Sequence, residues 1–126
     1  CEPQIKEIGD LISRTDVLLF GIGTAMRMAD QRHIADDVRK QLVDNHAVGE
    51  ALGQYCDIDG KLIYSTNNIG LSLPDVAKIP NVIAVAGGQD KSSAIIGVMR
   101  ACQKGILIID EQAAEGMRQL LQISAL

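Results

Sequence analysis

The 126-residue chain is 47% hydrophobic and 22% charged, enough apolar sequence for one sizeable core, which excludes a disordered segment. A formal net charge of -4 and the lack of Trp argue against a nucleic-acid-binding module, which would carry a basic face and often aromatic stacking platforms. Three widely spaced cysteines without a CxxC motif favour a reducing compartment, so we expect a cytoplasmic protein. We expect no membrane partner, since no signal segment and no apolar run of membrane-spanning length is present.

The chain is expected to begin with a helix followed by a strand. Residues 1–14 carry apolar side chains at helical spacing, which predicts an amphipathic helix. Those apolar positions are Ile5, Ile8, Leu11 and Ile12. Residues 16–20 are an apolar run stopped by glycines, a pattern typical of a central strand buried on both faces.

The middle of the chain is predicted to be mostly helical. Residues 34–56 indicate two helices, broken at the Asn45-His46 dipeptide. The Asp59-Gly60 dipeptide lies between residues with strand propensity and predicts a small hairpin near 56–65. We expect this hairpin to be a ribbon added to the main sheet.

The second half alternates between helices and apolar strands. Short apolar runs at 82–86 and 106–109 predict buried strands, and the segments 71–79, 89–104 and 111–123 predict helices. The residues expected to face the core from the last two helices are Ala94, Ile95, Val98, Met99, Cys102, Met117, Leu120 and Leu121. This alternation predicts a single α/β domain built on a mainly parallel, Rossmann-like sheet with helices on both faces and right-handed crossovers.

A ligand site in such a sheet lies beyond the carboxyl ends of the strands. The first segment at that position, GIGTAMRM, offers Gly21, Gly23, Thr24 and Arg27. It departs from the dinucleotide fingerprint because Met26 occupies a position that needs Gly or Ala, so no dinucleotide cofactor is expected.

Two later segments add a lysine and carboxylates at the same edge of the sheet. GGQDKSS places Gly88 and Lys91 at a helix N-terminus, where free N–H groups and the helix dipole favour an anion. IDEQAA supplies Asp110 and Glu111, whose carboxylates suit sugar hydroxyls or could pair with the lysine. Together these groups predict a site for a phosphorylated sugar.

Each of these residues also has a structural interpretation. The two glycines before Lys91 often mark only a tight turn, and the lysine itself could be a solvated residue of the first helical turn. Asp110 or Glu111 could cap the last helix. Arg27 and Arg32 could be ordinary surface charges.

Glu50 is a candidate for a different reason, because it lies among small residues on a predicted inward-facing helix. A buried carboxylate needs a partner, which makes a functional role more plausible than for a surface glutamate. His33 and His46 have no neighbouring ligands at a recognisable metal spacing, so no metal site is expected.

Three blocks resemble a known family: HAVGEALGQYCDIDGKLIY, IGLSLPDVAKIPNVIAVAGGQDKSSAIIGVMR and GILIIDEQAAEGMRQLL. They are similar to the effector-binding domain of SorC/DeoR-type bacterial transcriptional regulators, and the resemblance covers essentially the whole chain. It implies a fold similar to ribose-phosphate isomerase and glucosamine-phosphate deaminase, a homo-oligomer, and a phosphorylated sugar as allosteric effector. Fructose-1,6-bisphosphate or a neighbouring glycolytic phosphosugar is the implied ligand.

The resemblance also assigns roles to particular residues. It implies that Lys91 contacts a phosphate, that Glu50 contacts sugar hydroxyls, and that the loop at 21–24 with Arg27 holds a second anionic group. In this family a DNA-binding domain and a first α/β unit precede the matched region. Residues 1–126 are therefore expected to be the C-terminal part of an effector-binding domain, and DNA would be bound only through the N-terminal domain.

Two classes of function remain open from the sequence. The first is the effector-sensing domain of a regulator of carbohydrate genes, with no catalytic residue. The second is an isomerase or deaminase of the same fold, for which Glu50 or Asp110 could act as general base. The lack of a second titratable group clearly paired with either carboxylate argues against the enzyme.

Overall fold

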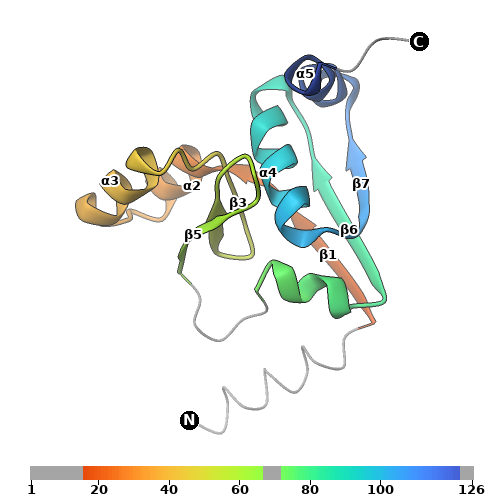
Figure 1. Cartoon of the computed structure of the whole chain (residues 1–126), viewed down its shortest axis with the longest axis horizontal. Coiled ribbons are helices and arrows are strands. Elements are labelled where there is room, and N and C mark those ends of the chain that lie inside the picture. Colours follow the sequence, from red (N-terminus) through yellow and green to blue (C-terminus); the bar gives the residue numbers. More distant parts are fainter. Residues whose placement is uncertain (1–15, 67–71, 123–126) are drawn as a thin grey trace, which may run out of the picture.

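The computed structural model describes residues 16–66 and 72–122, which form two sheets and their helices. The larger sheet is parallel, with the strand order β1-β6-β7, and α4 connects β6 to β7 (Figure 1). Its elements are β1 (Val17–Gly21), β6 (Asn81–Ala86), α4 (Ser92–Cys102), β7 (Ile106–Ile109) and α5 (Glu111–Leu121). The predicted parallel α/β architecture is confirmed, although β6 rather than β1 is the central strand of this sheet.

The second sheet is antiparallel and has the order β2-β3-β4-β5. Its strands are β2 (Gly23–Thr24), β3 (Gly49–Ala51), β4 (Gln54–Cys56) and β5 (Leu62–Ser65). The predicted hairpin near 56–65 is present as the β4-β5 pair, with Gly60 in the turn at φ +87°. The expectation that it joins the main sheet is wrong, because it pairs within the second sheet.

The prediction of two helices over residues 34–56 is also wrong in its second half. A helix is present as α3 (Asp36–Asp44), and α2 (Ala25–Gln31) precedes it, but residues 49–56 form the β3-β4 hairpin. Leu52 and Gly53 have φ values of 54° and 79°. Two successive positive φ angles make a tight hairpin turn, which a continuing helix cannot accommodate.

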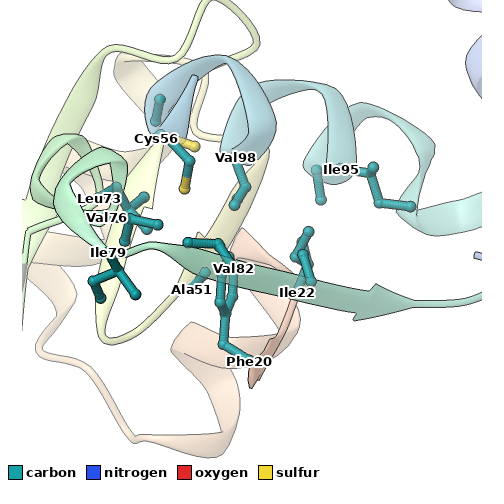
Figure 2. Close-up of a cluster of buried hydrophobic side chains, with 14 of the residues drawn as sticks. Phe20, Ile22, Ala51, Cys56, Leu73, Val76, Ile79, Val82, Ile95 and Val98 are labelled. Atoms are coloured by element: carbon teal, nitrogen blue, oxygen red, sulfur yellow. The ribbon is translucent and has the colours of Figure 1, made fainter. Parts of the chain in front are cut away.

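The core lies between one face of the parallel sheet and α4, where Ile95 and Val98 face Ile22 and Val82 (Figure 2). The prediction that the strands are buried on both faces is wrong within the described residues. Side chains alternate along each strand, and one set stays exposed, with Leu19 66% and Ile106 63% accessible. This open face consists of Val17, Leu19, Ile83, Val85, Ile106 and Ile108.

Helix α4 buries four of the five residues that its periodicity predicts and partly buries the fifth, Met99, but α5 does not follow its prediction. Leu120 and Leu121, predicted to face the core, are 51% and 38% exposed. Ala113 and Gly116 are buried in their place. A Cβ at Gly116 would clash with the Ser92 hydroxyl, so α5 packs closely on the start of α4 through its small residues.

The remaining elements are short. The helix predicted over 71–79 is the 3₁₀ helix η1 (Pro74–Lys78), and a second one, η2 (Gln89–Lys91), leads into α4. The helix predicted over 1–14 lies outside the described residues. Among the helices that are described, none has the length and hydrophobicity needed to cross a membrane.

Candidate functional site

An open pocket of about 400 Å³ lies at the carboxyl ends of β1 and β6, between the two sheets. This is the edge at which ligands bind in open α/β sheets. The pocket is lined by Phe20, Gly21, Ile22, Gly23, Met28, Arg32, Glu50, Leu52, Val85 and Lys91. It therefore brings together four of the residues that the sequence predicts for the site, namely Gly21, Gly23, Glu50 and Lys91.

Glu50 lies on β3 and is only 3% exposed, so its carboxylate is buried at the pocket wall. The Gly53 N–H donates to Glu50 Oε1 at 2.7 Å, and Arg32 Nη1 donates to the same oxygen at 2.9 Å. Within the described residues no hydrogen bond engages the second oxygen, Oε2. One oxygen thus anchors the carboxylate, and the other remains for a hydroxyl donor.

Arg32 supplies the positive charge that the buried Glu50 needs. Its Nη1 also lies 3.5 Å from the Tyr55 hydroxyl. Burial acts to lower the pKa of the Arg32 guanidinium, but its hydrogen bonds to Glu50 and Tyr55 outweigh that effect and raise it. Arg32 lies at the surface, with its side chain 36% exposed, but it is more than an ordinary surface charge because it pairs with a buried carboxylate. No sequence signal links it to this partner 18 positions away.

Tyr55 extends this cluster into the interior, since the residue is fully buried on β4. Burial raises the pKa of its hydroxyl, and the hydrogen bond from Arg32 only partly opposes this. Tyr55 stays neutral at physiological pH and packs against Tyr64 with 6.2 Å between the ring centroids. It fixes the position of Arg32 and, through it, of Glu50.

The glycine-rich segment at the end of β1 and the start of β2 lines the pocket with Gly21 and Gly23. Gly23 pairs with Glu50 across the β2-β3 ladder, and a Cβ at position 23 would lie 2.7 Å from Met28 Cγ. A larger residue would therefore displace Met28, which forms an apolar wall of the pocket. Thr24 follows at the N-cap position of α2 without a side-chain cap bond, next to the pocket but outside its lining.

Lys91 ends η2 and occupies the N-cap position of α4. Its backbone N–H donates to the Gly88 carbonyl at 3.2 Å, which closes the 3₁₀ turn. Among the described residues no side-chain hydrogen bond or ion pair engages the Lys91 ammonium group, although the residue lines the pocket. The lysine and the first turn of α4 are therefore placed to attract an anion.

Asp110 and Gly88 lie at the same sheet edge but bond to each other. The Gly88 N–H donates to both Asp110 carboxylate oxygens, at 3.0 and 3.2 Å, and the Ala113 N–H donates to Oδ1 at 2.8 Å. The N–H groups of Ala113 and Gly88 lower the pKa of Asp110. The predicted helix cap is confirmed, and neither residue lines the pocket.

Arg27, another predicted site residue, has surroundings unlike those of Glu50. It is exposed, and its Nη2 lies 3.8 Å from Asp90 Oδ2 in an ion pair between α2 and η2. It is not among the lining residues. The described part of the chain also contains no cluster of three or more His, Cys, Asp or Glu residues able to hold a metal ion.

Comparison with known proteins identifies the class to which this fold and pocket belong. Residues 1–119 match the family model described as "Putative sugar-binding domain". The chain belongs to this family, the sugar-binding domain of SorC/DeoR-type transcriptional regulators.

Individual relatives agree with this assignment. The "Central glycolytic genes regulator" of Bacillus subtilis is 38% identical over 114 residues, which are 90% of this chain and 34% of that protein. The protein of the same name from Priestia megaterium is 39% identical over 114 residues, 90% of this chain and 33% of its own length. A solved chain from Enterococcus faecalis, assigned to the SorC family, superposes with a TM-score of 0.83 at 39% identity, covering 92% of this chain and 47% of that one. The chain thus spans about a third of the length of the curated relatives that it matches.

Proposed function

We propose that this chain is the effector-sensing domain of a bacterial transcriptional regulator of carbohydrate genes, and that it binds a phosphorylated sugar. The observation that carries the proposal is the pairing of Glu50 and Lys91 in one pocket. A buried carboxylate with an oxygen available accepts hydrogen bonds from sugar hydroxyls, and an unengaged ammonium group binds phosphate. The glycolytic name of the two curated relatives supports fructose-1,6-bisphosphate or a related glycolytic intermediate as the ligand.

The position of the pocket also supports an allosteric role. Lys91 belongs to the parallel-sheet side of the pocket, whereas Glu50 belongs to the antiparallel sheet. A ligand that contacts both favours one relative arrangement of the two sheets, and such a preference is the physical basis of a shift between two states. In the intact regulator this shift would change the operator affinity of a separate DNA-binding domain.

The alternative is a phosphosugar isomerase or deaminase. The contacts and positions of its two candidate bases do not favour it. Glu50 is held through one oxygen by the Arg32 guanidinium and the Gly53 N–H, an arrangement that fixes the carboxylate as a hydrogen-bond acceptor. Asp110 is engaged by backbone N–H groups and lies outside the pocket. The relatives named above are transcriptional regulators, which also argues against an enzyme.

A thermal-shift series with fructose-1,6-bisphosphate, fructose-6-phosphate and free fructose tests this function. The phosphorylated sugars should raise the melting temperature, because a ligand at 100 times its Kd stabilises by about 2.7 kcal/mol. Free fructose should have little effect at the same concentration, and an assay for aldose-ketose conversion should detect no turnover. Equal responses to all three sugars, or measurable turnover, would contradict the proposal.

A further inference from the structure

The ion pair between Arg27 and Asp90 lies beside the pocket without lining it. Arg27 is on α2, and Asp90 is on η2, directly before Lys91 in the chain. Both side chains of the pair are more than half exposed. An exposed pair of this kind contributes little to stability, but its charges act on groups within about 8 Å. The pair can therefore influence what Lys91 binds.

Asp90 places a negative charge next to the ammonium group that is proposed to hold phosphate. Asp90 and Lys91 are consecutive, so their Cα atoms are about 3.8 Å apart. The Asp90 carboxylate lies against the same turn, since a Cβ at Gly88 would be 2.6 Å from Asp90 Oδ1. An unpaired carboxylate at this place would repel a phosphate and would also attract the lysine.

We propose that Arg27 is a positioning residue for phosphate binding, which neutralises Asp90 and so keeps Lys91 available to an anion. This role rests on the proposed function, because it concerns the phosphate at Lys91. Within the described residues, Asp90 pairs with Arg27 and not with the neighbouring Lys91, whose ammonium group has no ion-pair partner. Arg27 thus acts through Asp90 rather than by touching the ligand, which agrees with its place outside the pocket lining.

Loss of Arg27 would free the Asp90 carboxylate to compete with phosphate for Lys91. At about 8 Å in water, repulsion between one carboxylate and a phosphate of nearly two negative charges corresponds to about a sixfold change in affinity. Salt at physiological strength reduces this repulsion. We therefore expect an effect of about two- to fivefold at low to moderate salt.

A double-mutant cycle between Arg27 and Asp90 tests this role, with the Kd for fructose-1,6-bisphosphate measured by calorimetry. Arg27→Met should raise the Kd by about two- to fivefold, whereas Arg27→Lys should keep the parent value because it keeps the charge. Asp90→Asn should bind at least as tightly as the parent. Adding Arg27→Met to Asp90→Asn should cause no further loss, because the carboxylate that Arg27 neutralises is gone.

Two further measurements separate this role from a structural one. The melting temperatures of the ligand-free variants should match that of the parent. The difference in Kd between Arg27→Met and the parent should shrink from about 0.1 M to about 1 M salt, where the screening length falls from about 10 Å to about 3 Å. Asp44→Asn removes a similarly exposed carboxylate from an ion pair on α3 and should leave the Kd unchanged.

A loss of affinity when Arg27→Met is added to Asp90→Asn would overturn the proposal, because it would show that Arg27 contacts the ligand itself. An unchanged Kd for Arg27→Met alone would overturn it as well. Both results presuppose that the parent binds the phosphosugar. A parent that does not bind it contradicts the proposed function, and this role with it. If Arg27→Met does not fold, Arg27→Gln removes the same charge and is interpreted in the same way.

Discussion

Glu50 and Asp110, two of the carboxylates proposed from sequence as sugar ligands, lie in opposite environments. Asp110 is exposed at the start of α5 and accepts N–H groups from Gly88 and Ala113. Glu50 is buried at the pocket wall and is held by Arg32 through one oxygen. Backbone N–H groups engage both oxygens of Asp110, so that carboxylate has a structural role. Within the described residues Glu50 keeps one oxygen available, so it is suited to binding a ligand.

The energetic cost of burying a carboxylate leads to the same conclusion. A buried carboxylate is unfavourable unless it is paired and hydrogen-bonded, and even a paired one is often no more stabilising than an apolar replacement. If stability were the only requirement, a leucine in place of Glu50 and a methionine in place of Arg32 would stabilise the fold about as well. Their presence at the pocket is more simply explained by binding.

The largest expected effect is that of Glu50→Ala. It removes the acceptor of both Arg32 and the buried Gly53 N–H, and it also removes the proposed hydroxyl contact. Leaving these donors without a partner should lower the free energy of unfolding by about 1 to 3 kcal/mol, measured by urea denaturation. Phosphosugar binding should also fall below detection in calorimetry.

Glu111→Ala is the matched control for Glu50→Ala, because Glu111 is an exposed carboxylate in the first turn of α5. It should leave both stability and binding nearly unchanged. If Glu50→Ala binds the phosphosugar as the parent does, Glu50 has only a structural role and the comparison between the two carboxylates fails.

Arg32→Met should have the next largest effect, because it leaves the Glu50 carboxylate buried without its cation. Because Arg32 is partly exposed, solvent screens its interaction with Glu50. The free energy of unfolding should therefore fall by only about 1 kcal/mol at neutral pH.

Thermal melts of Arg32→Met at neutral pH check this loss, with Arg27→Met as the control. Arg27 is in an exposed ion pair, so its substitution should lower the free energy of unfolding by less than about 0.5 kcal/mol. Equal effects of the two substitutions would show that the arginine paired with the buried Glu50 and the arginine in the exposed ion pair do not differ as the structure indicates.

Asp110→Asn should have the smallest effect, confined to stability. The pKa of Asp110 is lowered by the N–H groups of Ala113 and Gly88, so its ionised form stabilises the fold above the unfolded-state pKa of about 4. That contribution is lost as the pH falls through the lowered folded-state pKa. The melting temperature of Asp110→Asn should lie slightly below that of the parent at pH 7, and the difference should shrink at more acidic pH.

Ligand affinity distinguishes Asp110 from Glu50 most clearly. Because Asp110 does not line the pocket, calorimetry with Asp110→Asn should give a Kd within a factor of about two or three of the parent value. A loss of tenfold or more would place Asp110 in the site after all.

The strand-helix alternation was sufficient to predict β1, β6, β7, α4 and α5, because long apolar periodicity is a local signal. It could not predict the β3-β4 hairpin, since the turn depends on Leu52 adopting a positive φ that its residue type disfavours. It also placed Glu50 on a helix, although the expectation that this carboxylate needs a partner was confirmed.

The site was predictable only in part for a similar reason. Strand ends followed by glycines indicated Gly21, Gly23 and Lys91, because chain geometry alone brings such positions together. Arg32 and the Gly88-Asp110 bond could not be predicted, since they depend on contacts between residues 18 and 22 positions apart. The resemblance to a family supplied Glu50 and Lys91 as a pair, and the structure places both on one pocket.

The most direct test of the central claim is the affinity of Lys91→Ala for fructose-1,6-bisphosphate, measured by calorimetry beside Lys40→Ala, an exposed lysine on α3. Loss of one charge-assisted contact to phosphate, worth roughly 1.5 to 3 kcal/mol, should weaken binding by about ten- to a hundredfold. Lys40→Ala should bind as the parent does, and both variants should keep the melting temperature of the ligand-free protein. If Lys91→Ala and the parent bind the phosphosugar equally well, Lys91 is a solvated helix residue and the proposed phosphate site is wrong.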